Sequence, residues 1–125
     1  MDENEVSNQI IGAAIEVHRH LGPGMLEAIY RDCLAHELRS RGLCVEKEVV
    51  LPVRYKDLEL AGAYRADLLV QKLVMVELKA VESVAPVFTA QLLSYLRMSG
   101  LRLGLLINFN TLQLKDGVKR VVNKL

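Results

Sequence analysis

The spacing of the apolar residues changes near Gly42, and this change constrains the fold more than any other feature of the sequence. Before Gly42 apolar residues recur every three or four positions, which is typical of amphipathic helices. From Cys44 onward they alternate with polar residues, which is typical of half-buried strands. The chain therefore belongs to the α/β class, with helices preceding the first strands.

Two helices are predicted before Gly42. The first runs from about Ser7 to Leu21 and ends at Gly22-Pro23-Gly24. The second runs to about Arg41, where Gly42 is a stop signal. The apolar sides of these helices carry Ile11, Ala14, Ile15 and His18 in the first, and Tyr30, Leu34 and Leu38 in the second.

Three strands are predicted next. Alternation from Val45 to Tyr55 indicates the first, and Lys56-Asp57 turns the chain. Residues 64–70 and 74–79 give the other two. They are linked only by the short break around Gln71-Lys72, so they must pair antiparallel.

A third helix is predicted between Pro86 and Gly100, because proline suits the first helical turn and glycine the residue after the last. Residues 101–107 form a continuous apolar run that predicts a central strand, and residues 118–122 predict an edge strand. The whole order predicts one domain over residues 1–125, a sheet flanked by helices.

Composition leaves several function classes open. The formal charge of +1 neither requires nor excludes nucleic acid, and two cysteines outside any C-x-x-C pair indicate reduced thiols. An acidic start and the absence of an apolar run of ~20 residues predict a cytoplasmic protein with no membrane partner. A hydrophobic content of 51%, with uninterrupted apolar runs after Leu101, suggests that a second copy covers some apolar surface as a homodimer.

Glu77 and Lys79 lie two positions apart on a predicted strand, so their side chains leave the same face. Asp67 joins that face if it lies opposite Glu77. In that register the other face is entirely apolar, whereas a one-residue slip would mix the two sets. The residues of that apolar face are Leu68, Val70, Val74, Val76 and Leu78.

Two neighbouring carboxylates raise each other's affinity for a cation, and hard oxygen ligands suit Mg²⁺ or Mn²⁺. Such an ion neutralises charge that builds on a phosphate, and the ammonium of Lys79 can orient the attacking water or stabilise the same charge. The alternative is a solvated strand face, since an E-x-K pair by itself is more often structural.

Five further polar side chains have both a functional and a structural interpretation. Glu27 either serves the site or favours the positive end of its helix, and Tyr30 either hydrogen-bonds in the site or is core. His18 either contacts substrate or is a satisfied core histidine, since no histidine has metal-ligand spacing. Gln91 and Tyr95 form an i, i+4 pair that either borders the site or packs with the tyrosine in the core.

Several motifs together resemble the GxxExxY proteins, a branch of the PD-(D/E)XK nuclease superfamily. They are His18-x-x-Leu21-Gly-Pro-Gly24-x-x-Glu27-x-x-Tyr30, then Tyr64-Arg65-Ala66-Asp67, then Glu77-Leu-Lys79. The resemblance spans residues 9–123 and implies a restriction-endonuclease-like core with a mixed central sheet. The sequence departs from the superfamily pattern at Ala66, which stands where the superfamily name has proline.

The resemblance also implies roles for individual residues. Asp67 and Glu77 would bind the metal together with the carbonyl of Leu78, and Lys79 would be the catalytic lysine. Glu27 would match the acidic residue on the helix before the sheet. Gln91 and Tyr95 resemble the Q-x-x-x-Y helix of RecB-type nucleases, which contacts nucleic acid.

The sequence therefore favours a Mg²⁺- or Mn²⁺-dependent nuclease acting on DNA or RNA, with DNA the first candidate. An idle nucleic-acid-binding or assembly module of the same fold is the alternative, because related folds can lose their chemistry. A purely structural dimer is a third hypothesis.

Overall fold

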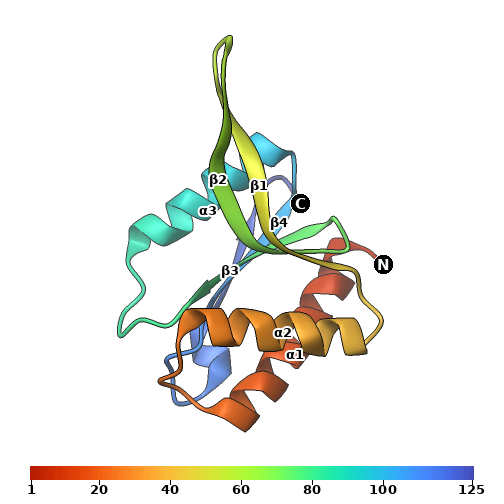
Figure 1. The fold of residues 1–125 in the computed structure, drawn as a ribbon, viewed down its shortest axis with the longest axis vertical. Helices are drawn as coiled ribbons and strands as arrows, with labels where there is room; N and C mark the ends of the chain where they lie inside the picture. Colours follow the sequence, from red (N-terminus) through yellow and green to blue (C-terminus); the bar gives the residue numbers. More distant parts are fainter.

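A computed structural model describes residues 1–125 and contains three α-helices, a short 3-10 helix and five strands (Figure 1). The order of elements is the predicted one. Their bounds are α1 Glu3–Leu21, α2 Glu27–Ser40, β1 Val45–Tyr55, β2 Leu58–Val70, β3 Val74–Lys79, α3 Pro86–Ser99, β4 Leu103–Asn108, η1 Leu114–Gly117 and β5 Val118–Val122.

The five strands form one mixed sheet in the order β1-β2-β3-β4-β5. Only β3 and β4 run parallel, because α3 carries the chain back between them, and the other neighbours are antiparallel. The predicted edge strand is β5, and β4 is an interior strand as expected. The centre of the sheet is β3, which carries Glu77 and Lys79.

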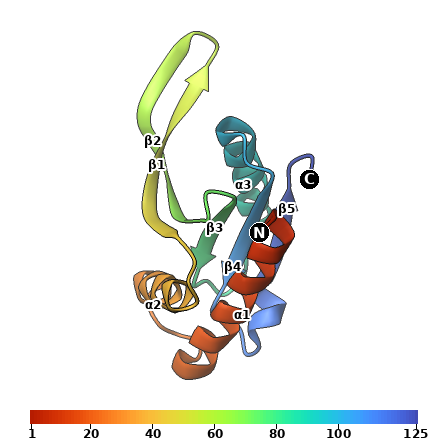
Figure 2. The same cartoon turned by 90° about the vertical axis from the view of Figure 1, so that its right-hand side faces the viewer.

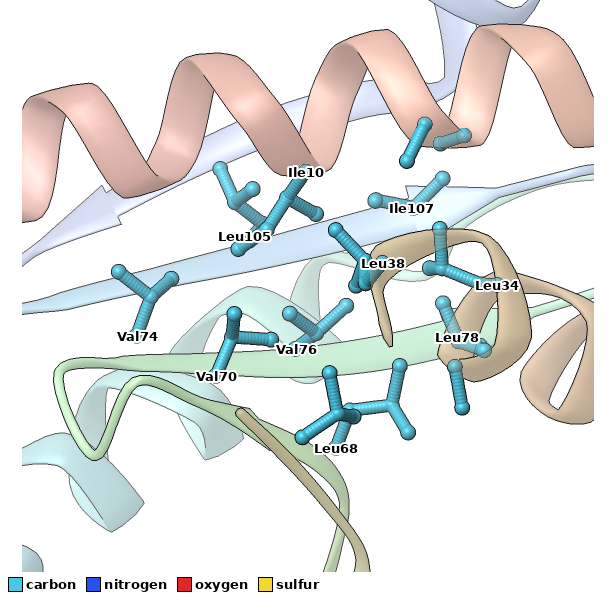
Figure 3. Packing of buried hydrophobic residues seen from close by; sticks show 14 of the residues in the cluster. Ile10, Leu34, Leu38, Leu68, Val70, Val74, Val76, Leu78, Leu105 and Ile107 are labelled. Carbon is cyan, nitrogen blue, oxygen red and sulfur yellow. The ribbon is translucent and has the colours of Figure 1, made fainter. Parts of the chain in front are cut away.

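Helices cover both faces of the sheet (Figures 1 and 2). Helices α1 and α2 pack on one face, where the larger core forms, and α3 packs on the other with a smaller cluster. Figure 3 shows side chains from α1, α2 and the strands meeting in the larger core. That core includes Ile10, Leu34, Leu38, Leu68, Val70, Val74, Val76, Leu78, Leu105 and Ile107. None of the helices has the length and hydropathy needed to span a membrane.

Helix α1 begins four residues earlier than the apolar spacing predicted. The Asp2 carboxylate accepts a hydrogen bond from the Glu5 N–H at 2.8 Å, and the Glu5 side chain accepts one from the Asp2 N–H at 3.2 Å. This capping box satisfies two N–H groups that the helix leaves free. At α3 the predicted signals are confirmed, with Pro86 at the first position and Gly100 in the left-handed conformation at φ 74°.

The β1–β2 hairpin differs most from expectation. Strand β2 begins at Leu58 instead of Tyr64, because a bulge between the pairs Leu51↔Tyr64 and Val53↔Leu60 interrupts the alternation without ending the strand. The distal hairpin was predicted to be half-buried, but it projects past both helical layers (Figure 2). Tyr55 is consequently 63% exposed.

The apolar run after Leu101 lies inside the protein, because every residue of β4 is buried between the helical layers. The structure thus removes the sequence argument that this run needs a second copy to cover it. Apolar surface that remains uncovered lies elsewhere, notably on the hairpin.

Candidate active site

The register of β2 against β3 is the predicted one. The pairs Leu68↔Val76 and Val70↔Val74 place Asp67 opposite Glu77 when continued by one step. The turn that sets this register contains no glycine. Gln71 and Lys72 instead take positive φ values of 55° and 56°, and the Gln71 side chain accepts a hydrogen bond from the Cys44 N–H at 2.6 Å.

The two strands separate just where the acidic residues lie. Backbone pairing ends at Leu68↔Val76, and the Asp67 carboxylate accepts the Leu78 N–H at 2.8 Å instead. On one side of this point Leu68 packs in the larger core, whereas Ala66 packs in the smaller cluster beneath α3. The bend in β2 therefore directs Asp67 toward β3.

Glu77 lies half-buried beside Asp67 and accepts a hydrogen bond from the Tyr64 hydroxyl. Burial raises the pKa of Glu77 to about 8, and the negative charge of Asp67 is the second cause of this rise. The Tyr64 hydrogen bond acts in the opposite direction. The ring of Tyr64 stacks on Tyr95 of α3 with centroids 3.2 Å apart, which fixes the hydroxyl toward Glu77.

Glu27 is the first residue of α2 and lies within electrostatic reach of the same group. Desolvation raises the pKa of Glu27, and the charge of Asp67 raises it further, while Lys79 and Arg31 oppose the change. Its place at the N-terminal end of the helix also suits a negative charge. The N-terminal end of α2 thus borders the carboxylates, with Glu27 as its first residue.

Lys79 is the last residue of β3 and lies half-buried next to this cluster. Its Nζ is 4.2 Å from the centroid of the Phe88 ring, in the first turn of α3. The backbone carbonyl of Lys79 accepts the Phe109 N–H at 2.9 Å. The ammonium is thus held by an aromatic face and attracted by the carboxylates of Glu27 and Glu77.

The donor set fits a hard divalent cation. Asp67 and Glu77 converge, and the pKa of Glu77 is raised first by burial and then by the negative charge of Asp67. No group of three His, Cys, Asp or Glu side chains is arranged to hold a metal ion. Mg²⁺ does not require such a cage, because it commonly binds through one or two carboxylates and keeps water or substrate oxygens at the other positions.

A family model described as the PD-(D/E)XK nuclease superfamily matches residues 4–121. The chain belongs to this superfamily. Its members are generally nucleases and usually use Mg²⁺ or Mn²⁺. The mixed sheet and the element order agree with the superfamily fold, as the sequence predicted. No curated protein and no solved structure was found to match the chain.

Two motif residues lie outside the carboxylate cluster of this superfamily member. Tyr30 has no exposed surface; its hydroxyl donates to the Gly22 carbonyl at 2.5 Å and accepts the Met25 N–H at 3.0 Å. His18 is buried, and its Nε2 bonds the Thr111 carbonyl at 2.8 Å. Tyr30 therefore has no surface with which to contact substrate, and His18 has the hydrogen bond of a satisfied core histidine.

These buried rings support the site indirectly. Tyr30 stacks on Phe109 with centroids 4.4 Å apart, and the Phe109 N–H in turn bonds the Lys79 carbonyl. The Tyr30 hydroxyl also fixes the Gly22–Met25 turn that leads into Glu27. One aromatic pair therefore holds both the start of α2 and the end of β3 in place.

The Gln91–Tyr95 pair lies on α3 as predicted. Tyr95 contacts the cluster through Tyr64, while Gln91 is exposed one helical turn earlier. This arrangement brings Tyr95 to the border of the carboxylates and leaves Gln91 open to solvent.

Three residues around the site were not singled out from the sequence. Tyr64 appeared only as part of a motif, and its contact with Glu77 depends on the bend in β2, which alternation does not reveal. Phe88 reaches Lys79 across the start of α3. Asn108 is buried, and its side chain bonds the Val81 N–H at 3.1 Å and the Val81 carbonyl at 2.9 Å. A lone polar residue ending an apolar run was the available signal for Asn108.

Proposed function

We propose that this protein is a Mg²⁺- or Mn²⁺-dependent nuclease that hydrolyses phosphodiester bonds of DNA or RNA. The observation that carries the proposal is the convergence of Asp67 and Glu77 where β2 and β3 separate, with Lys79 at the end of β3. Membership of a nuclease superfamily supports the same chemistry.

Asp67, Glu77 and the carbonyl of Leu78 would hold the cation. One carboxylate oxygen of Asp67 is occupied by the Leu78 N–H, so the second oxygen is available as a ligand. The hydrogen bond from Tyr64 similarly orients Glu77. When bound, the divalent ion supplies charge neutralisation for the phosphate during hydrolysis.

Lys79 and Glu27 complete the proposed catalytic set. The ammonium of Lys79 would orient the attacking water or stabilise negative charge on the phosphate. Glu27 adds a further negative charge close to Lys79 and Asp67, which helps to position the ammonium and favours a cation at the site. Phe88 limits the positions that the lysine can take.

Nucleic acid would reach these groups along α3. Tyr95 lies at the border of the carboxylates, and Gln91 is exposed one helical turn earlier. Both side chains would contact a substrate strand. DNA is the first substrate to test and RNA the second. His18 and Tyr30 would act by fixing the surrounding structure, not by contact.

The test measures cleavage of labelled single- and double-stranded DNA and RNA with Mg²⁺ or Mn²⁺, with and without EDTA. Asp67→Asn keeps an acceptor for the Leu78 N–H but removes the charge, and it should lower the rate about a hundredfold or more. Glu59→Gln makes the same type of change at an exposed position of β2 and should cleave like the wild type. Activity that survives both EDTA and Asp67→Asn would refute the proposal.

An idle nucleic-acid-binding or assembly module is the second candidate. It is favoured by the hydrogen bond from the Tyr64 hydroxyl, which stabilises the Glu77 carboxylate from within the protein. Calorimetry separates the two. No heat on adding Mg²⁺ or Mn²⁺, with retained binding of DNA or RNA, supports the idle module, whereas heat that Asp67→Asn removes supports the nuclease.

A further inference from the structure

The β1–β2 hairpin forms an arm that extends beyond the rest of the sheet (Figures 1 and 2). Strand β2 pairs with β3 only over Leu68–Val70, so most of its length pairs with β1 alone. An isolated two-stranded ribbon is marginally stable in water. The distal arm therefore lacks the layers that stabilise the other strands.

One face of the distal arm is apolar. Val53 lies opposite Leu60 and Tyr55 lies opposite Leu58, and directly opposed residues share a face of a sheet. These four residues define the arm face. Tyr55, Leu58 and Leu60 are 63%, 53% and 46% exposed, so nothing in the chain covers them. The opposite face carries the Arg54–Glu59 ion pair.

A contiguous apolar patch that stays in water usually marks an interaction surface. The arm face has the alternation of a strand that packs on something, but within one chain only Val53 is half-buried, and the other three side chains stay exposed. The residues nearer the sheet differ, because Leu51 and Tyr64 on the same side pack against the cluster under α3. The arm thus continues a buried face outward as an exposed one.

The free edge of β1 is poorly suited to bind a further strand. Pro52 has no N–H to donate, and Glu48 breaks the regular backbone with a φ of 52°. Features of this kind discourage edge-to-edge pairing in natural sheets. A partner would therefore bind the arm through side chains on its face and not through backbone hydrogen bonds.

The balanced charges of the arm favour a second copy of the chain as its partner. Residues 48–65 contain three basic residues (Arg54, Lys56, Arg65) and three acidic residues (Glu48, Asp57, Glu59). A balanced surface offers no general attraction to a polyanion, but it lets two identical surfaces match opposite charges around an apolar centre. Nucleic acid is thus a poor occupant of the arm face, and a second copy of the chain is a good one.

We propose that two copies of this protein associate through their arm faces, with Val53, Tyr55, Leu58 and Leu60 of each copy packed against the same residues of the other. The association is a symmetric, isologous dimer. Specific interfaces bury on the order of 800 Å² on each partner, so polar residues beside the arm face contribute as well.

Leu58→Glu and Val50→Glu form a matched pair for the test. The two positions are 53% and 54% exposed on the same arm, but Val50 lies on the opposite face, paired with Arg65. Sedimentation or light scattering at micromolar concentration should show a dimer for the wild type and for Val50→Glu. Leu58→Glu should weaken the association at least about tenfold. Circular dichroism and thermal unfolding confirm that each variant is folded.

Three outcomes would overturn the proposal. A monomeric wild type across the micromolar range excludes a second copy as the occupant. A dimer that Leu58→Glu leaves intact, or that both variants weaken equally, excludes the arm face as the interface. A monomeric wild type whose binding to single-stranded DNA or RNA is lost only in Leu58→Glu identifies nucleic acid as the occupant instead.

Discussion

The two ends of β2 belong to one strand but lie in different surroundings. Near Asp67 the strand is enclosed by β1, β3 and helices on both faces, and Leu68 has no exposed surface. Near Leu58 the strand pairs only with β1, and Leu60 is 46% exposed. The same residue type on the same strand is therefore core at one end and surface at the other.

This difference shows that alternation determines on which face of the sheet a side chain lies. The neighbouring helices and strands determine whether that face is buried. At the enclosed end, burial of the apolar residues fixes the register of β2 against β3 and brings Asp67 beside Glu77. At the open end, the same pattern leaves an apolar face in water. Both the candidate active site and the proposed dimer surface depend on the position at which β2 ceases to pair with β3.

Leucine truncation at the two ends gives the largest expected contrast. Leu68→Ala removes fully buried methyl groups and should lower the free energy of unfolding by about 2–5 kcal/mol. Leu60→Ala should change it by no more than about 0.5 kcal/mol in dilute protein. Urea unfolding of both variants measures the difference.

Measuring both leucine variants at several protein concentrations gives a further test. If the arm faces pair, the cost of Leu60→Ala rises with protein concentration, because only the dimer buries that side chain. The cost of Leu68→Ala has no such dependence. Equal costs for the two variants at low concentration would show that the arm is packed within one chain, contrary to the structure.

Much of the fold can be predicted from the sequence, because apolar spacing indicates which residues face the core. Strand β3 was predicted with the bounds Val74–Lys79, and β5 with Val118–Val122, because turn residues and apolar runs mark their ends. The start of α1 was missed, since its first turn is held by the polar capping box at Asp2 and Glu5, outside the apolar spacing. The length of β2 was missed because a bulge looks like a strand end.

The meeting of Asp67 with Glu77 could be predicted from the sequence, but the contacts of Tyr64 and Phe88 with the site could not. The register that joins Asp67 and Glu77 follows from burial of the apolar set that alternates with them. Tyr64 lies on the bend of β2, and Phe88 meets Lys79 only because α3 begins over the end of β3. Such contacts depend on how elements pack, which local spacing does not encode.

The next largest expected difference between the enclosed and exposed ends of β2 is in how stability depends on pH. In the metal-free folded protein the pKa of Glu77 is raised from 4.5 to about 8, so the folded state holds this proton more tightly than the unfolded state. Stability should therefore fall as the pH rises from 4.5 to 8, because the buried group becomes charged. Unfolding measured in EDTA across this interval gives the slope.

Glu77→Gln should flatten that slope and stabilise the protein toward the alkaline end, since the amide carries no charge. Glu59→Gln removes a carboxylate from the exposed arm and should keep the wild-type slope. A slope that Glu77→Gln leaves unchanged would assign the pH dependence to other groups and place Glu77 in a more solvated environment than the structure shows.

The smallest expected effect comes from removing the Tyr64 hydroxyl, which donates a hydrogen bond to Glu77. Tyr64→Phe keeps the ring stacked on Tyr95 but removes a hydrogen bond that lowers the pKa of Glu77, so this pKa should rise further. A hydrogen bond of this kind is worth about 1 kcal/mol net, which corresponds to roughly fivefold weaker Mn²⁺ binding near neutral pH by calorimetry. Tyr95→Phe is the matched control, because the Tyr95 hydroxyl has no hydrogen bond to Glu77. If both variants bind Mn²⁺ equally well, the role of Tyr64 is limited to packing.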